Sequence, residues 1–169
     1  MELLLANKKD IKAHQTIWIE AYSKNFKNHW IKNGFELYIE DQFNEIRLIS
    51  DIKDSYIDYF FITLNNNPVG FLKIKTKIDN SEHDCELEKI YILPKYLGQG
   101  IGKLALQEII KKMQILGKKN LQLDVIDTNT NAILFYKTLG FIKTGTTTLD
   151  ALFFKEKLRG MFIMRLDLN

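Results

Sequence analysis

The chain has 169 residues, of which 46% are apolar and 27% are charged, a composition typical of globular rather than disordered proteins. A net charge of +3 is too balanced to indicate a nucleic-acid or membrane-surface binder. The single cysteine, Cys85, excludes an internal disulfide, and the three histidines are too dispersed for a local metal motif. No apolar run is long enough to cross a bilayer. We therefore expect one domain over residues 1–169, cytoplasmic, with no metal, membrane or nucleic-acid partner.

The N-terminal part of the chain is predicted to be mainly helical. A short strand at 3–6 comes first. Apolar residues at three- and four-residue steps then predict one helical region before Asn33 and Gly34, and a second region from 35 to 49. Asn33 and Gly34 separate the two regions because this pair favours a break in a helix.

Strands dominate the middle of the chain. Aromatic and β-branched residues at 56–64 and the alternation at 69–78 predict two strands, joined by turn residues at 65–68. The two strands should form a hairpin. A third strand at 85–93 ends at Pro94.

The C-terminal part alternates between helices and strands. The pattern predicts a helix at 101–116, a strand at 121–126, a helix that follows Asn129 and ends at Leu139, and strands at 141–144 and 161–168. The unit from 85 to 126 implies a parallel strand pair with a right-handed crossover. The predicted fold class is therefore mixed α/β: a mostly antiparallel sheet with a central parallel strand pair, flanked by helices.

The most informative segment is the glycine-rich loop that precedes the helix at 101–116. Its alternate glycines let the main chain approach a ligand closely, and the start of the helix offers free N–H groups and a positive dipole end. This combination predicts a site for a phosphate or pyrophosphate group. The expected binding residues are Gly98, Gln99, Gly100, Ile101, Gly102 and Lys103. For Lys103, a solvated position is the alternative.

Two nucleotide-binding motifs fit this loop poorly. A P-loop needs a hydroxyl residue after its Gly-Lys pair, but Leu104 follows Gly102 and Lys103. A dinucleotide-binding loop needs a third glycine where Lys103 stands, and it belongs to the first βα unit of a domain. A tight turn without a ligand is the remaining alternative.

Further along the chain, a second motif favours an acyl-CoA ligand. Residues 129–136 (NTNAILFY), followed by Leu-Gly-Phe at 139–141, resemble the acyl-CoA-binding signature of the GNAT superfamily of N-acetyltransferases. The loop at 97–102 resembles the family's pyrophosphate loop, (Q/R)-x-x-G-x-(G/A), and residues 87–94 resemble the strand before it. All three occur in the family's order. Leu97 is a departure, because the family usually has Gln or Arg there.

The resemblance implies acetyl-CoA as cosubstrate and assigns several contacts to it. The main chain of Ile90, Tyr91 and Ile92 is expected to pair with the pantetheine arm and to hold the thioester oxygen. Asn129 and Asn131 are expected either to cap the following helix or to reach the pantetheine amides.

Three side chains are candidates for the chemistry. Tyr136 matches the family's general acid, and a phenol remains protonated at neutral pH, although a core aromatic is the alternative. Glu86 and Glu88 are candidates for the base, Glu86 because it aligns with the catalytic glutamate of some family members. At a two-residue period they should share a strand face with Ile90 and Ile92, unless a bulge intervenes. For either glutamate, an ordinary ion-paired or solvent-facing position is the alternative.

The acceptor is expected to be a primary amine that attacks the thioester directly in a ternary complex. Residues 20–26, 38–44 and 87–92 resemble the PaiA-type bacterial spermidine/spermine acetyltransferases. With the acids Glu36, Glu40 and Asp41 of the N-terminal region they favour a polyamine. For these acids, ordinary surface charge is the alternative. An amino acid, peptide or protein amine is the alternative, as is a CoA-binding sensor without turnover. The family often forms homodimers, so a homodimer is possible here.

Overall fold

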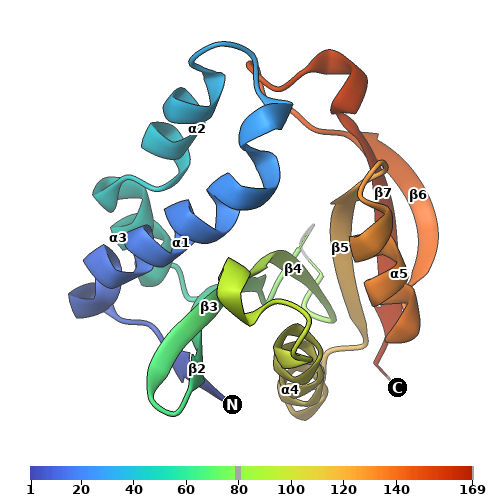
Figure 1. Ribbon diagram of the computed structural model, residues 1–169. Coiled ribbons are helices and arrows are strands. Elements are labelled where there is room, and N and C mark those ends of the chain that lie inside the picture. The colour runs from blue at the N-terminus through green and yellow to red at the C-terminus, as the bar shows by residue number, and fades with distance from the viewer. Residues whose placement is uncertain (79–80, 169) are drawn as a thin grey trace.

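A seven-stranded sheet forms the centre of the computed structural model, which describes residues 1–78 and 81–168 (Figure 1). The strand order is β1-β2-β3-β4-β5-β7-β6. The strands are β1 (Glu2–Leu5), β2 (Ile57–Leu64), β3 (Asn67–Lys75), β4 (Asp84–Ile92), β5 (Asn120–Ile126), β6 (Ile142–Thr148) and β7 (Gly160–Asp167). Among the described residues, β4 and β5 alone pair in parallel, and every other neighbouring pair is antiparallel. The predicted mixed α/β class is confirmed.

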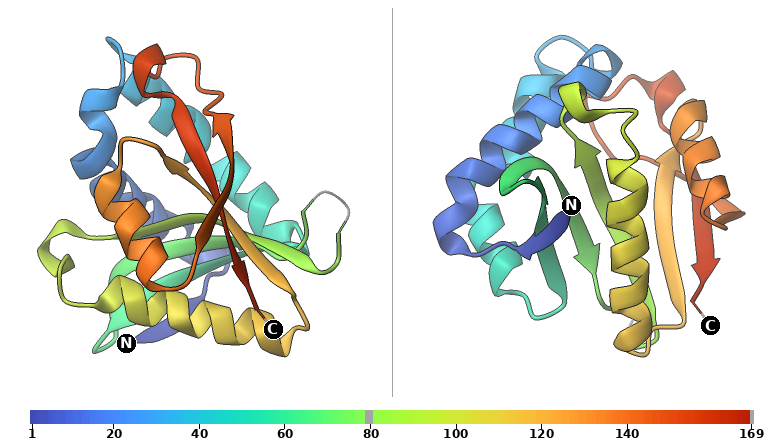
Figure 2. Two further views of the ribbon diagram at one scale, coloured as in Figure 1. Left: turned by 90° about the vertical axis from the view of Figure 1, so that its right-hand side faces the viewer. Right: turned by 60° about the horizontal axis from the view of Figure 1, so that its bottom comes forward.

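Helices cover both faces of the sheet (Figure 2). The helices are α1 (Ile11–Phe26), α2 (Gly34–Gln42), α3 (Glu45–Lys53), α4 (Ile101–Ile115) and α5 (Thr130–Thr138). α1 and α3 pack on the face of β2 and β3 that carries Tyr59, Phe61 and Phe71. α4 and α5 pack on the opposite face, against Leu72 and Leu123 among others. No helix within the described ranges is long and apolar enough to cross a membrane.

The second helical region differs from the prediction because it consists of two helices. α2 ends at Gln42, and α3 begins after Asn44, whose side-chain oxygen accepts a hydrogen bond from the Arg47 amide at 2.8 Å. An N-cap of this kind satisfies an amide that has no partner within the helix. Apolar spacing alone does not reveal the break, because the apolar residues continue on both sides of it.

The predicted hairpin of β2 and β3 is confirmed, and its turn explains the run of asparagines. Asn65 and Asn66 have φ angles of 50° and 62°, the left-handed conformation that a two-residue hairpin turn requires and that asparagine tolerates. β3 then runs beside β4 along most of its length. This arrangement leaves β4 in the middle of the sheet.

β4 and β5 separate soon after they begin to pair. They pair only at Asp84 with Asn120, Cys85 with Leu121 and Glu86 with Gln122. From residue 87 to residue 92, β4 therefore has a strand neighbour on the β3 side alone. The separation opens a gap in the sheet above the start of α4, which can be followed in Figure 1.

A bulge interrupts β4 at Glu88. Lys73 of β3 pairs with Lys89, but the next residue of β3, Ile74, pairs with Leu87, so Glu88 is the extra residue. A bulge of this kind shifts the alternation of side chains by one position.

The bulge overturns one expectation about β4. Ile90 and Ile92 pack in the core beneath α4, whereas Glu86 and Glu88 both contact the Lys75 ammonium on the opposite face. The expectation that the two glutamates share a face with Ile90 and Ile92 is therefore wrong. The physical reason is the extra residue, which exchanges the two faces along the strand.

Candidate active site

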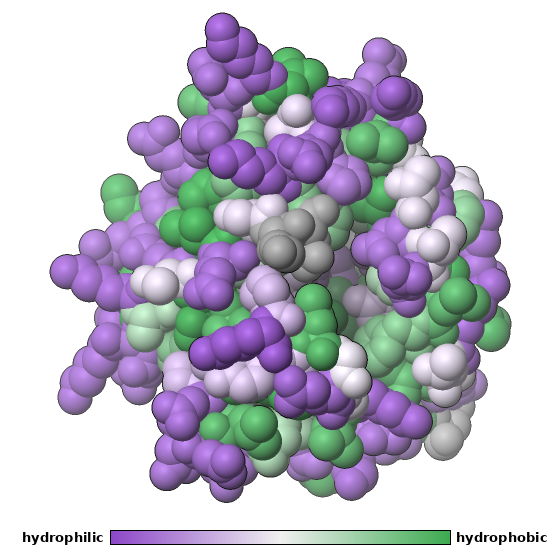
Figure 3. Space-filling model, in the orientation of Figure 1, coloured by the Kyte–Doolittle hydropathy of each residue, from purple (hydrophilic) through white to green (hydrophobic). Residues whose placement is uncertain are grey.

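The candidate site lies where β4 and β5 separate. Three parts of the chain border it: the free segment of β4 at 87–92, the loop before α4, and α5 with the end of β5. Figure 3 shows the surface hollowed in this part of the molecule, with mainly apolar residues on the α5 side. The sequence motifs therefore meet at one place in the fold.

The glycine loop has the conformation that its composition predicts. Gly98 and Gly100 both have a φ of +76°, which side-chain-bearing residues rarely adopt. An added Cβ at either position would have no atom within 4 Å, so the main chain is open to a ligand. Gln99 donates a hydrogen bond to the Lys95 carbonyl at 3.0 Å and braces the loop from within.

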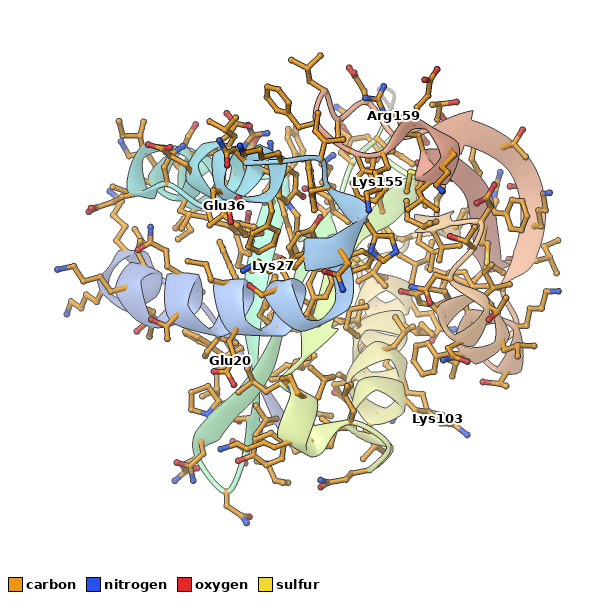
Figure 4. The ribbon with its side chains drawn as sticks, turned by 45° about the horizontal axis from the view of Figure 1, so that its top comes forward. Glu20, Lys27, Glu36, Lys103, Lys155 and Arg159 are labelled. Carbon is orange, nitrogen blue, oxygen red and sulfur yellow. The ribbon has the colours of Figure 1, made fainter. Side chains whose placement is uncertain are left out.

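The start of α4 is also free to bind an anion. Its N-cap is Gly100, and no side chain caps the helix. An added Cβ at Gly102 would lie 3.8 Å from both Ile92 of β4 and Phe135 of α5, so this turn sits between the two other borders of the site. Lys103 is exposed and extends from α4 (Figure 4). Leu97, where the family usually has a polar side chain, is also exposed.

Tyr136 lies half-buried on α5. Its ring packs at 5.2 Å from the Phe135 ring and at 5.7 Å from the Phe141 ring. Burial raises the pKa of Tyr136 to about 12. The Tyr136 side chain also packs against the core cluster that contains Ile92 of β4. Tyr136 is therefore a neutral hydroxyl near β4, where it can donate a proton.

Asn129 and Asn131 occupy different surroundings at the start of α5. The Asn129 side-chain oxygen accepts a hydrogen bond from the Ala132 amide at 3.2 Å, so Asn129 caps the helix. Asn131 lies in the first turn of α5 and is exposed. Of the two expected roles, the structure shows the cap for Asn129, and a contact with the pantetheine arm stays a prediction for both.

Glu88 is surrounded by three lysines. Its carboxylate contacts the ammonium groups of Lys73 and Lys89 at 3.0 Å each, and that of Lys75 at 3.2 Å. Burial alone would raise the pKa of Glu88, but Lys89, Lys73 and Lys75 outweigh this effect and lower it to about 2. Glu88 is therefore a weak proton acceptor.

Glu86 has fewer ammonium partners than Glu88. Its carboxylate contacts the Lys75 ammonium at 3.3 Å, and its main chain pairs with Gln122 at the last position where β4 and β5 meet. Two residues further along β5 stands Asp124, which the motifs did not single out. Burial raises the pKa of Asp124, and the negative charge of Glu86 adds to the shift, while Lys75 opposes it.

Glu86 and Asp124 thus bring two carboxylates to the place where the strands separate. The pairing of Glu86 with Gln122 puts the residues on one face, because Asp124 follows Gln122 by two positions. The sequence signal that could have found Asp124 is this period of two. Using it requires the register of β4 against β5, which the sequence does not contain.

An aromatic cluster joins the N-terminal helices to the other side of the site. Tyr22 of α1 stacks on Tyr38 of α2 at 5.1 Å and meets the Tyr91 ring edge-on at 5.6 Å. Trp30 continues the cluster, 4.5 Å from Tyr38 and 5.0 Å from Phe154 of the β6–β7 connection. Segments far apart in the sequence therefore form one wall beside β4.

The acids expected to bind the acceptor do not lie together. Glu36 lines a hollow of about 370 Å³ with three lysines, Lys27, Lys32 and Lys155. Figure 4 shows Glu36, Lys27 and Lys155 on separate elements around this region. Glu40 lines a second hollow, of about 540 Å³.

Asp41 has a different partner again, because it forms an ion pair at 3.7 Å with Arg47. The three acids Glu36, Glu40 and Asp41 therefore have separate surroundings. These three carboxylates therefore do not form a single acceptor site in this structure.

Comparisons with known proteins agree with the geometry. The model of the acetyltransferase (GNAT) family matches residues 16–141. An uncharacterized N-acetyltransferase of Schizosaccharomyces pombe is 37% identical over 60 residues, and the match spans 36% of this chain and only 37% of that protein. The peptidyl-lysine N-acetyltransferase YjaB of Salmonella typhimurium is 28% identical over 123 residues, 73% of this chain and 72% of the relative.

The fold has been seen before in a complex with coenzyme A. The crystal structure of the PaiA N-acetyltransferase from Thermoplasma acidophilum with coenzyme A has a TM-score of 0.80 and 21% identity, and the match covers 99% of both chains. The strand order, the open glycine loop and the matched residues lead to one conclusion. This chain belongs to the acetyltransferase (GNAT) family of N-acetyltransferases.

Proposed function

We propose that this enzyme transfers the acetyl group of acetyl-CoA to a primary amine by direct attack while both substrates are bound. The observation that carries the proposal is the open, uncapped start of α4 at the gap between β4 and β5. Main-chain N–H groups at such a start bind pyrophosphate. The free edge of β4 from 87 to 92 then offers strand-like pairing to the pantetheine arm, which includes Ile90, Tyr91 and Ile92.

The residues present fit acetyl-CoA, which supplies the activated acetyl group. Gly98, Gly100 and Gly102 allow the close approach, and the missing polar side chain at Leu97 removes none of the main-chain donors. A main-chain N–H of the free β4 segment would hold the oxygen on which charge develops during attack.

We assign the proton that the departing thiolate needs to Tyr136. When the amine nitrogen bonds to the acetyl carbon, the carbon–sulfur bond breaks and the sulfur receives the phenolic proton. A Tyr136 hydroxyl with a pKa of about 12 is fully protonated at neutral pH, so it is always ready to donate. The packing of Tyr136 against the core cluster that contains Ile92 of β4 supports this assignment, since the thioester would lie along β4.

The acceptor must lose a proton as well. An ordinary alkyl ammonium with a pKa of about 10.4 is neutral in roughly one molecule in 2,500 at pH 7, so a base or a water chain accelerates the reaction. Of the two expected bases, we assign the role to Glu86, acting through water. Glu86 has one ammonium partner, whereas Glu88 has three and a pKa of about 2.

For the acceptor we propose a polyamine. The support is the resemblance of three segments to the PaiA type and the pair of carboxylates, Glu86 and Asp124, beside the gap. Carboxylates form charge-assisted hydrogen bonds with ammonium groups. An amino acid, peptide or protein amine is the alternative.

A panel of amines tests the proposal. Spermidine, spermine, ornithine, lysine and a short peptide are assayed with acetyl-CoA, and thiol release is measured. We expect turnover with the polyamines, and loss of that turnover in Tyr136→Phe with acetyl-CoA binding unchanged. Turnover of the peptide alone would overturn the polyamine assignment. Binding of CoA without acetylation of any amine would point to a sensor instead.

A further inference from the structure

The charge cluster around Glu88 lies beside the candidate site, and the proposed reaction does not use it. Lys73, whose side chain is 5% exposed, contacts the Oε2 atom of Glu88 and the Oδ2 atom of Asp51 of α3 at 2.9 Å each. Asp51 also accepts a hydrogen bond from the Tyr59 hydroxyl at 2.7 Å. The cluster therefore connects the bulge of β4, through β3, to a helix on the outer layer.

Stability does not by itself explain why charged rather than apolar residues occupy these positions. Removing charges from water is costly, and well-packed apolar side chains often replace a buried ion pair without loss of stability. The position of the cluster offers a better explanation for its charged residues. Glu88 is the single extra residue of the β4 bulge, so its contacts act where the strand changes direction.

The segment after the bulge is the one that borders the site. From 87 to 92 its main chain pairs with β3 on one side, and its other edge faces the gap. At its far end, Gly70 of β3 lets the two strands approach closely: an added Cβ there would lie 2.4 Å from the Tyr91 carbonyl oxygen. The segment is thus held at one end by this close approach and at the other by the Glu88 cluster.

We propose that Glu88 is a positioning residue: through Lys73 and Lys89 it fixes the bulge, and the bulge aims the free main-chain N–H groups of residues 87–92 at the acetyl carbonyl of acetyl-CoA. The inference rests on the proposed function. In this role Glu88 transfers no proton and does not contact the acetyl group. The specificity that it serves is the choice of acetyl-CoA over CoA, since only acetyl-CoA has the acetyl group that carries this carbonyl.

Two variants test the inference from opposite sides of the ion pair. Glu88→Gln removes the carboxylate, and Lys73→Met removes a partner but leaves the carboxylate in place. Glu82→Gln is the matched control, because Glu82 pairs with Lys77 at the surface. Calorimetry gives the Kd of acetyl-CoA and of CoA for each variant. Hydrogen exchange gives the protection of amides 87–92 in the free protein.

We expect both test variants to behave alike. The ratio of the CoA Kd to the acetyl-CoA Kd should fall about tenfold, the effect of one main-chain hydrogen bond, while the CoA Kd itself changes less than twofold. Amides 87–92 should exchange faster, and Glu82→Gln should match the wild type. The double variant should be no worse than either single one, because both remove the same tie.

A base would behave differently. If Glu88 took the proton, Glu88→Gln would abolish the acid limb of the kcat–pH profile, and Lys73→Met would move that limb to higher pH. Both would leave the acetyl-CoA preference and the exchange unchanged, and this result would overturn the inference. Hydrogen exchange is measured in the absence of ligand. A wild type that binds no acetyl-CoA would therefore refute the proposed function, while the exchange of amides 87–92 would still test whether Glu88 fixes the bulge.

A milder variant covers the case in which Glu88→Gln does not fold. The Lys75 side chain is 35% exposed, so Lys75→Met leaves a smaller imbalance of charge. We expect a two- to threefold loss of acetyl-CoA preference from it, with faster exchange at 87–92. Wild-type values of both would contradict the inference.

Discussion

The two sides of the candidate site are built in different ways. On the proposed acetyl-CoA side, from β4 to α5, main-chain groups line the gap, and local glycines shape it. On the proposed acceptor side, side chains from α1, α2 and the β6–β7 connection meet in an aromatic cluster. A surface of main-chain groups tolerates sequence change as long as its backbone is kept. A surface of side chains can change its ligand with each substitution. The comparison teaches that the backbone carries the signal for the cosubstrate, whereas individual side chains carry the signal for the acceptor.

Tyr136→Phe is expected to give the largest effect, because it removes the proposed general acid and leaves the main-chain surface intact. We predict a loss of kcat between about a hundredfold and ten-thousandfold, with the Kd of acetyl-CoA unchanged. Steady-state kinetics and calorimetry measure the two quantities. Full activity in this variant would show that the thiolate takes its proton from elsewhere.

Acid should weaken the tie between β4 and the N-terminal layer. The pKa of Glu88 is lowered from 4.5 to about 2, so its stabilising effect is complete above pH 4.5 and is lost as the pH falls toward 2. The size of this effect is about 3 kcal/mol in the free energy of unfolding. Urea unfolding of the wild type and Glu88→Gln between pH 7 and pH 2 measures it. The difference between them should shrink over that range, and a constant difference would contradict the assignment.

Gly100→Ala sharpens the comparison on the acetyl-CoA side. Its φ of +76° makes a side chain unfavourable by about 1 kcal/mol, and the added methyl group would enter the open space in which we propose that the pyrophosphate binds. Gly117→Ala is the matched control, because Gly117 has a φ of +71° at the other end of α4. Both should lose similar stability, but only Gly100→Ala should weaken acetyl-CoA binding, by about tenfold. Equal binding in the two variants would mean that the ligand does not touch this loop.

Glu36→Gln addresses the acceptor side and should have the smallest effect. Three lysines share its hollow, so the potential there is already positive and one carboxylate contributes little. We predict a two- to threefold rise in the KM for a polyamine with no change in the acetyl-CoA Kd. A tenfold rise would show that this hollow binds the acceptor directly.

Much of the fold followed from the sequence because its signals are local. Three such signals predicted the elements that are found, and each of them acts within a few residues. They are the asparagine turn, the stripe of apolar residues along α4, and the glycines of the loop before α4. The break between α2 and α3 was missed because apolar spacing continues across Phe43 and Asn44. The cap that causes the break is a single hydrogen bond.

Only part of the candidate site could be predicted from the sequence. The glycine loop and Tyr136 belong to motifs, so their positions were clear before the fold was known. The faces of Glu86 and Glu88 were not, since one bulge in β4 reverses them. Asp124 was not predicted, because only the pairing of β4 with β5, which are distant in the sequence, brings it near Glu86. Long-range register, rather than composition, determines those parts.

Titration of the purified protein with acetyl-CoA tests the central claim most directly. Calorimetry should show one saturable site for acetyl-CoA, no binding of ATP or NAD, and weaker binding in Gly100→Ala than in Gly117→Ala. Absence of acetyl-CoA binding to the wild type would contradict the account, because the open loop before α4 would then serve no cosubstrate.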